Sequence, residues 1–74
     1  MRNKFKAWLI KNYGIKRWKE FAEGPNTYTE SLAKFFKRFK PHQYIEHGLC
    51  WTSTAPFEWA EINEAWIKHL KNIT

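Results

Sequence analysis

The chain has 74 residues and a formal net charge of +6, and fourteen of its residues are aromatic, five of them Trp. A chain of this length forms one domain at most and lies near the lower size limit for independent folding. Its single cysteine excludes an internal disulfide, so burial of aromatic side chains must supply most of the stabilisation.

No targeting or membrane segment is evident in the sequence. The first ten residues alternate charged and apolar groups, unlike the continuous apolar core of a signal peptide. No stretch approaches the roughly 18 apolar residues of a membrane-spanning helix. The single free cysteine favours a reducing compartment. We therefore expect a soluble, cytoplasmic protein that has no contact with membranes.

The basic residues gather in the first half of the chain. Residues 1–40 contain eleven Lys and Arg against three Glu, a balance of +8, and residues 41–74 contain two Lys against four Glu, a balance of −2. The chain has no Val and is rich in Lys, Glu, Phe and Trp, a composition that favours helix over sheet. We predict an all-α fold, a compact single domain of four or five short helices over residues 1–74.

The first two helices are expected at residues 2–13 and 16–23. The first has the spacing of an amphipathic helix and ends at Gly14. The second ends before Gly24-Pro25-Asn26, a sequence that breaks helices. The side chains expected to face inward are Met1, Phe5, Trp8, Leu9, Asn12, Ile15, Trp18, Phe21 and Ala22.

A third helix is predicted from Tyr28 to Lys40. Thr27 and Glu30 have the spacing of a capping box at its start, and Pro41 ends it. Its apolar arc, expected in the core, consists of Leu32, Phe35, Phe36 and Phe39, and its opposite arc consists of Lys34, Lys37 and Arg38.

The last helix, at about residues 56–72, has the most regular pattern. Ser53 or Thr54 is expected to cap it, with Pro56 in its first turn. Its apolar residues recur three or four positions apart, as a buried helical stripe requires, at Trp59, Ile62, Trp66, Leu70 and Ile73.

The sequence pattern does not fix the conformation of the intervening residues 41–55. Pro41 to His47 is compatible with one or two helical turns closed by Gly48, and Leu49 to Thr52 is compatible with an extended segment. Cys50 lies in an apolar run, which suggests a buried filler.

Five rings lie at the expected helix ends or in loops. They are Tyr13, Tyr28, Tyr44, Trp51 and Phe57. Such rings either close the ends of a small core or anchor a partner, because Tyr and Trp are enriched at binding hot spots. Both interpretations stay open, and Tyr28 and Phe57 are the candidate anchors.

A basic surface is the main candidate site. Lysine and arginine beside aromatic rings suit an acidic protein face through electrostatic steering, and also suit phosphates and stacked bases. A solvated lysine-rich helix face is the alternative interpretation. The candidate partner-binding cations are Lys16, Arg17, Lys19, Lys34, Lys37, Arg38 and Lys40.

The same segment has the rhythm of a helix-turn-helix motif: a short helix, a turn containing glycine and a longer basic helix. Two residues weaken this interpretation. Glu20 occupies a position that usually packs inward, and Glu30 opens the third helix, where base contacts are normally made.

Metal and catalytic groups are sparse. The soft ligands are His42, His47, Cys50 and His69, and they show no zinc-site spacing. A nucleophile pair of Cys50 and His47 has no oriented oxyanion hole nearby. We therefore expect no metal, no cofactor and no enzymatic activity.

One segment resembles a known pattern. Trp51-Thr52-Ser53-Thr54, followed by Phe57-Glu58-Trp59 and Ile62-Asn63, is similar to small uncharacterised bacteriophage proteins. In those proteins a Trp-Ser-x-Thr turn precedes a helix that opens with an aromatic–Trp pair. The resemblance covers residues 51–63 and implies a phage origin, hence the host cytoplasm, without implying an activity.

Three functional hypotheses follow. The first is a non-enzymatic, phage-encoded interaction protein that binds and inhibits a host macromolecule, most simply an acidic protein surface, through basic and aromatic residues. The second is a nucleic-acid-binding protein that uses the basic helix 28–40. The third is a structural homo-oligomer whose surplus rings pack against another copy.

Overall fold

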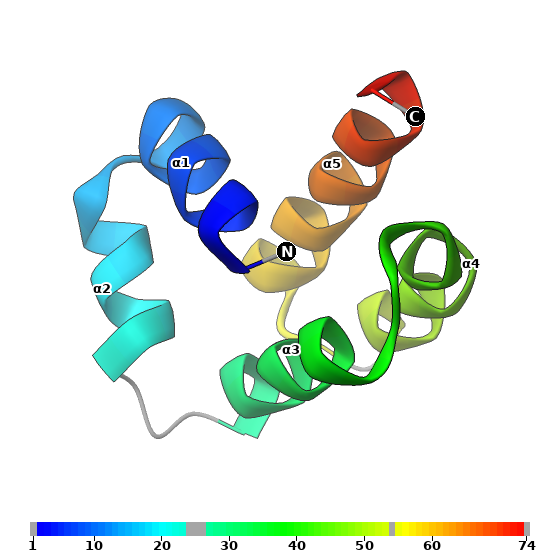
Figure 1. Cartoon of the computed structure of the whole chain (residues 1–74). Coiled ribbons are helices and arrows are strands. Elements are labelled where there is room, and N and C mark those ends of the chain that lie inside the picture. The colour runs from blue at the N-terminus through cyan, green and yellow to red at the C-terminus, as the bar shows by residue number, and fades with distance from the viewer. Residues whose placement is uncertain (1, 24–26, 54, 74) are drawn as a thin grey trace.

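Five helices account for almost all of the described chain. The computed structural model describes residues 2–23, 27–53 and 55–73, and no strand occurs in those ranges. Its Cα radius of gyration is 11.1 Å, close to the roughly 11 Å expected for a compact domain of this length. The predicted compact all-α fold is confirmed. The helices are α1 (Arg2–Tyr13), α2 (Ile15–Glu23), α3 (Thr27–Arg38), α4 (Pro41–Thr52) and α5 (Phe57–Ile73) (Figure 1).

Some of the sequence predictions concern residues outside the described ranges. These are the inward position of Met1, the break at Gly24-Pro25-Asn26 and the capping role of Thr54.

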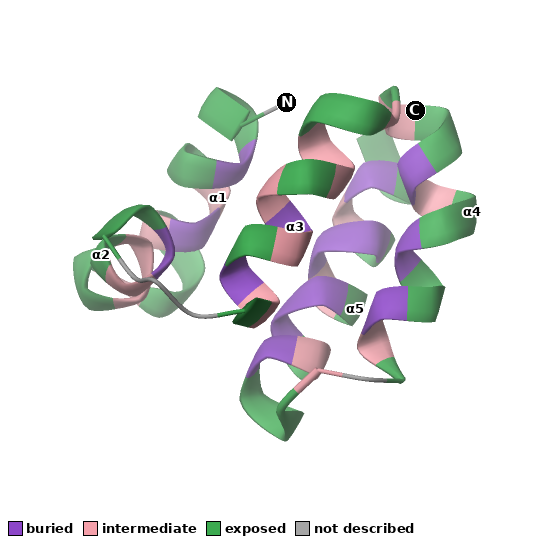
Figure 2. Cartoon of the chain, turned by 90° about the horizontal axis from the view of Figure 1, so that it is seen from below, coloured by how far each residue is buried: buried purple, intermediate pink, exposed green. Residues whose placement is uncertain are grey.

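Helix α5 provides the largest part of the core. Its predicted stripe is buried from Trp59 to Leu70, whereas Ile73, in its last turn, is 56% exposed. The other helices reach α5 through aromatic rings: Phe5 of α1 lies 5.2 Å from the Trp66 ring, and Phe21 of α2 lies 6.5 Å from the Trp59 ring. Figure 2 shows the buried residues along the inner faces of α5 and its neighbours.

Phe5 joins three of the helices to α5. It is fully buried, and its ring centroid lies 5.2 Å from Phe21 and 4.9 Å from Phe36, both in edge-to-face geometry. Each such ring pair contributes about 0.5–1.5 kcal/mol beyond area burial. The core of this small chain is therefore largely aromatic, as its composition predicts.

The turn between α1 and α2 requires glycine. Gly14 has φ of +93°, and its N–H donates to the carbonyl of Ile10 at 3.0 Å. The inward positions predicted for Asn12, Ile15 and Ala22 are wrong, because all three residues are exposed. Phe21 is the one buried residue of the nine-residue helix α2, and Trp18 is partly buried against the same core.

Helix α4 resolves the uncertain segment 41–55. It is one continuous helix, and Gly48 lies in its interior and is buried. A Cβ atom at Gly48 would lie 3.1 Å from the Tyr44 ring and 3.1 Å from Cδ1 of Ile67. The glycine thus allows the close approach of α4 to α5, and the prediction that it ends a helix is wrong.

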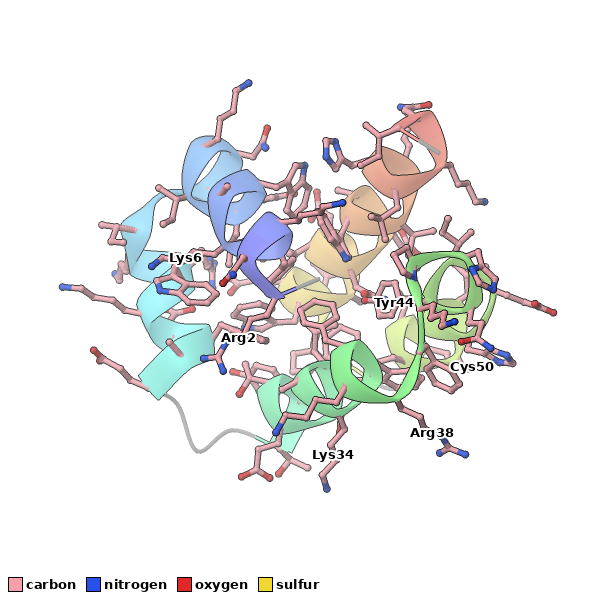
Figure 3. The ribbon with its side chains drawn as sticks, in the orientation of Figure 1. Arg2, Lys6, Lys34, Arg38, Tyr44 and Cys50 are labelled. Carbon is pink, nitrogen blue, oxygen red and sulfur yellow. The ribbon has the colours of Figure 1, made fainter. Side chains whose placement is uncertain are left out.

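Continuation of this helix also explains the exposure of Cys50. Three successive helical residues point in different directions. Only Trp51 of this run reaches the core, while Leu49 is 48% exposed and Cys50 is exposed. Figure 3 shows Cys50 on the outer side of α4. The prediction that Cys50 is a buried filler is therefore wrong.

A buried polar network fixes α4 against α5. The side chain of Asn63 is fully buried, and its Nδ2 donates to the carbonyl oxygen of Gly48 at 2.8 Å. Its Oδ1 accepts a hydrogen bond from the Tyr44 hydroxyl. Burial raises the pKa of Tyr44 well above its ordinary value. The network satisfies an amide and a phenol that the low-polarity core would otherwise disfavour.

Candidate partner-binding surface

The outer side of α3 combines cations with partly exposed rings. Lys34, Lys37 and Arg38 are exposed, whereas Phe35 and Phe39 are partly buried. Figure 3 shows Lys34 and Arg38 pointing outward from the helix. We call these five residues the α3 surface. Leu32 is fully buried, and Phe35, Phe36 and Phe39 pack against the core, so Phe35 and Phe39 present only part of their rings beside the exposed cations.

A hollow of about 220 Å³ lies on this surface. It is lined by Ser31 together with Lys34, Phe35, Arg38 and Phe39. The guanidinium carbon of Arg38 lies 5.3 Å from the centre of the Phe39 ring, and that ring stacks on His47 of α4 at 4.8 Å. The hollow therefore has an aromatic floor and a cationic rim, with no carboxylate among its lining residues.

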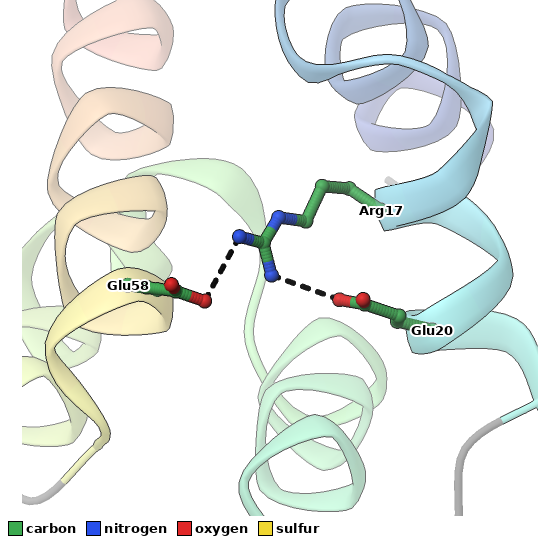
Figure 4. A network of polar contacts seen from close by, with 3 residues as sticks. All are labelled: Arg17, Glu20 and Glu58. Carbon is green, nitrogen blue, oxygen red and sulfur yellow. Dashed lines mark hydrogen bonds and ion pairs between the residues drawn. The ribbon is translucent and has the colours of Figure 1, made fainter.

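Arg17, one of the predicted site residues, is held by the chain's own glutamates. Its Nη1 lies 2.9 Å from Oε2 of Glu20, and its Nη2 lies 2.8 Å from Oε2 of Glu58, which ties α2 to α5 (Figure 4). Burial lowers the pKa of Arg17, but the hydrogen bonds to Glu58 and Glu20 outweigh it and leave the pKa above its ordinary value. Arg17 thus has a structural partner.

The other predicted cations are free of such pairs. Over residues 2–23, 27–53 and 55–73, both ion pairs belong to Arg17. The remaining predicted cations are all exposed, and they are Lys16, Lys19, Lys34, Lys37, Arg38 and Lys40. Their charge is therefore available to a partner.

The five rings predicted at helix ends divide into two groups. Tyr44 and Trp51 are buried and belong to the core. Tyr28 is partly buried with its ring 5.8 Å from Trp59, whereas Tyr13 is 38% exposed and Phe57 is 81% exposed. Of the two candidate anchors, Phe57 is open to solvent and Tyr28 presents only part of its ring.

Sequence reasoning assigned Phe35 and Phe39 to the core, and both rings do pack against it, but that reasoning missed that they also line the hollow. Each of the two rings lies next to a cation in the sequence, but so does Phe36, so sequence position alone does not single them out. His47 was missed as well, because its stacking on Phe39 depends on a continuous α4.

A second ring with cations lies between α1 and α2. Arg2 and Lys6 lie 5.6 Å and 5.4 Å from the centre of the Trp18 ring. Such cation–π contacts contribute about 0.5–1 kcal/mol at exposed sites. Figure 3 shows both cations on the side of α1 that faces α2.

The described residues contain no group of three or more His, Cys, Asp or Glu that could hold a metal ion. Among the same residues, no helix has both the length and the apolar character needed to cross a membrane.

Comparisons with protein-family models, with curated proteins and with solved structures find no match to this chain.

Proposed function

We propose that the protein is a non-enzymatic binding protein whose α3 surface docks on an acidic face of a partner protein. One observation carries the proposal: the cations of α3 are exposed and have no carboxylate partner within the described residues, and Lys34 and Arg38 line a hollow together with the rings of Phe35 and Phe39.

The two kinds of residue contribute differently to such an interface. Rings that lose water on binding supply affinity, and they concentrate at hot spots. Surface cations mainly raise the association rate and fix the orientation. Phe35 and Phe39 would therefore provide apolar contact, while Lys34, Lys37 and Arg38 orient the partner. Phe57, at 81% exposure, is the candidate for a further apolar anchor.

A protein of this kind acts by occupying its partner's surface. If the phage resemblance of residues 51–63 reflects its origin, the partner is a host macromolecule in the cytoplasm and the effect is inhibition. This part of the proposal is tested by the identity of whatever the chain captures from a host lysate.

Capture with matched variants tests the α3 assignment. The double variant Lys34→Glu/Arg38→Glu and the control Lys68→Glu/Lys71→Glu change the net charge equally, at exposed positions of different helices. We expect the first to lose the captured protein and the second to retain it, with unchanged helicity in both. Equal retention by the two variants would remove the assignment to α3.

Direct nucleic-acid binding through helix 28–40 is the second candidate. It is favoured by the pairing of Arg38 with the partly exposed ring of Phe39, because bases stack on rings while cations neutralise phosphates. A gel-shift titration at about 50 mM and 200 mM salt tests it, since affinity must fall steeply with salt. Absence of a shift at the lower concentration would discard this candidate.

A further inference from the structure

A groove between α1 and α5 lies apart from the α3 surface. Its volume is about 460 Å³, within the roughly 300–1,000 Å³ of ligand sites, and about twice that of the hollow on α3. The two helices spread apart towards Tyr13 and Ile73 (Figure 1). The groove lies where they diverge, and its lining includes Lys4, Trp8, Lys11, Asn12, His69 and Ile73.

Trp8 forms a rigid aromatic part of this lining. Its ring lies 5.2 Å from Trp66 and 6.0 Å from His69, which itself stacks on Trp66 at 5.5 Å. Asn12 Nδ2 donates to the backbone carbonyl of Trp8 at 2.8 Å, which supports the helix at this point. Trp66 is fully buried, whereas Trp8 keeps part of its surface exposed. A planar group entering the groove would therefore meet the exposed part of an indole that neighbouring rings hold in place.

Two cations flank that indole along the helix. Lys4 precedes Trp8 by about one turn and Lys11 follows it by about one turn, so the two lysine Cα atoms lie roughly 10 Å apart along the axis. Both lysines are exposed, neither makes an ion pair within the described residues, and no carboxylate lines the groove. The groove thus offers a ring between two positive charges.

We propose that this groove binds an unpaired nucleic-acid strand, with one base stacked on Trp8 and the phosphates on its two sides at Lys4 and Lys11. A ring with cations on both sides matches a nucleotide within a strand, because phosphates both precede and follow its base. A free mononucleotide carries phosphate on one side only and would use one of the two lysines. A paired base is stacked inside its duplex and cannot reach the ring.

The inference uses a different face from the α3 surface and does not rest on a protein partner. It places nucleic-acid binding at Lys4, Trp8 and Lys11, which lie outside helix 28–40. Nucleic-acid binding at α3 and strand binding at Trp8 are therefore separable by mutation.

The test uses fluorescence anisotropy of a labelled thymidine octanucleotide with the intact chain at about 50 mM salt. The variant Lys4→Gln/Lys11→Gln should weaken binding about tenfold and lower the salt slope by about 1.4, since each single-strand phosphate contact contributes about 0.7. The charge-matched control Lys68→Gln/Lys71→Gln should change affinity less than threefold.

Tryptophan fluorescence reports stacking separately from charge. Binding of the octanucleotide should quench part of the emission of the wild-type chain. The variant Trp8→Phe keeps a ring for stacking but removes that fluorophore, so the quench should disappear while affinity stays within about fivefold. If the strand did not stack on Trp8, any quench would come from other tryptophans and would be unchanged in Trp8→Phe.

Each of the following outcomes overturns the inference: equal weakening by the groove and control variants, a quench that persists in Trp8→Phe, or equally tight binding of thymidine monophosphate. Loss of binding in Lys34→Gln/Arg38→Gln but not in the groove variant would overturn it and leave nucleic-acid binding at α3 standing. Absence of any octanucleotide binding at low salt would rule out strand binding in the groove, whereas the proposed binding of an acidic protein partner would be unaffected.

Discussion

At the scale of single residues, Asn63 is the polar side chain on which the packing of α4 against α5 depends most. It satisfies the Gly48 carbonyl and the Tyr44 hydroxyl together. Gly48 and Tyr44 belong to α4 and Asn63 to α5, so the three groups hold one register between the helices. No apolar residue can replace the amide without leaving buried polar atoms unpaired.

Asn63→Ala should lower the free energy of unfolding by about 2–4 kcal/mol. A buried group left without a partner costs about 1–3 kcal/mol, and here a carbonyl and a hydroxyl are affected. Urea denaturation measures the change, with exposed Asn12→Ala as the control that should cost less than about 1 kcal/mol. A cost for Asn63→Ala no larger than that of the control would mean that the network contributes nothing to stability.

Tyr44 makes stability depend on alkaline pH. Its folded-state pKa is raised by burial, so the phenol stays protonated in the folded chain while the unfolded chain ionises near pH 10. The contribution of Tyr44 is thus complete below pH 10 and is lost as pH rises further, at up to about 1.4 kcal/mol per pH unit.

Denaturation between pH 9 and pH 11 tests this dependence. The comparison is with Tyr44→Phe, which keeps the ring and removes the ionisable group. The slope of stability against pH above 10 should be shallower in Tyr44→Phe. Parallel slopes in the two proteins would show that Tyr44 does not titrate differently in the folded state.

At the scale of helices, the charges at the ends of α3 and α5 complement the helix dipole, whereas the cations in the first turn of α1 oppose it. Both α3 and α5 have a glutamate in the first turn, and the last turn contains Lys37 and Arg38 in α3 and Lys71 in α5. The first turn of α1 has no acidic residue and contains Arg2 and Lys4. Helix stability therefore gives no reason for a cation at Lys4, whereas a ligand in the α1/α5 groove does.

Lys4→Glu should raise the free energy of unfolding by about 0.3–1 kcal/mol, because a carboxylate in the first turn complements the dipole. The melting temperature should rise by a few degrees, since about 1 kcal/mol corresponds to roughly 4–8 °C in a domain of this size. The same change should weaken octanucleotide binding. Glu30→Lys, the reverse change at the start of α3, should lower stability by a similar amount; a destabilised Lys4→Glu would contradict the dipole argument.

Helices with regular spacing could be predicted from the sequence, and α4 could not. The stripe of α5 identified Trp59 and Trp66 as core, because spacing alone determines which face of a helix is buried. The sequence of α4 contains Gly48, which disfavours helix locally, and the close approach of Gly48 to Ile67 of α5 is a tertiary contact that no local pattern reveals. The errors at Gly48 and Cys50 both arose from the absence of that tertiary information.

At the scale of the whole molecule, the sequence predicted the excess of positive charge but not which cations are free. Pairing of Arg17 with Glu58 joins residues 41 positions apart, which no local pattern reveals. The partial exposure of Phe35 and Phe39 likewise depends on how much of α3 its neighbours cover. The charge of the candidate surface could therefore be predicted from the sequence, whereas the hollow lined by two rings could be seen only in the folded structure.

The exposed apolar side chains at the two ends of α5 do not form one patch with each other. Phe57 and Ile73 mark the two ends of α5, about 24 Å apart along its axis. A self-associating face needs contiguous apolar area. We therefore expect a monomer in sedimentation at micromolar concentration; a concentration-dependent dimer would favour the structural homo-oligomer instead.

The free cations of α3 are central to the proposed function, and the most direct test is an amide chemical-shift map of the isotope-labelled chain with its captured partner. Docking on the α3 surface predicts the largest shifts at Ser31, Lys34 and Arg38, with weaker ones at His47 behind Phe39. Shifts confined to the exposed face of α4 around Leu49 and Cys50 would contradict it.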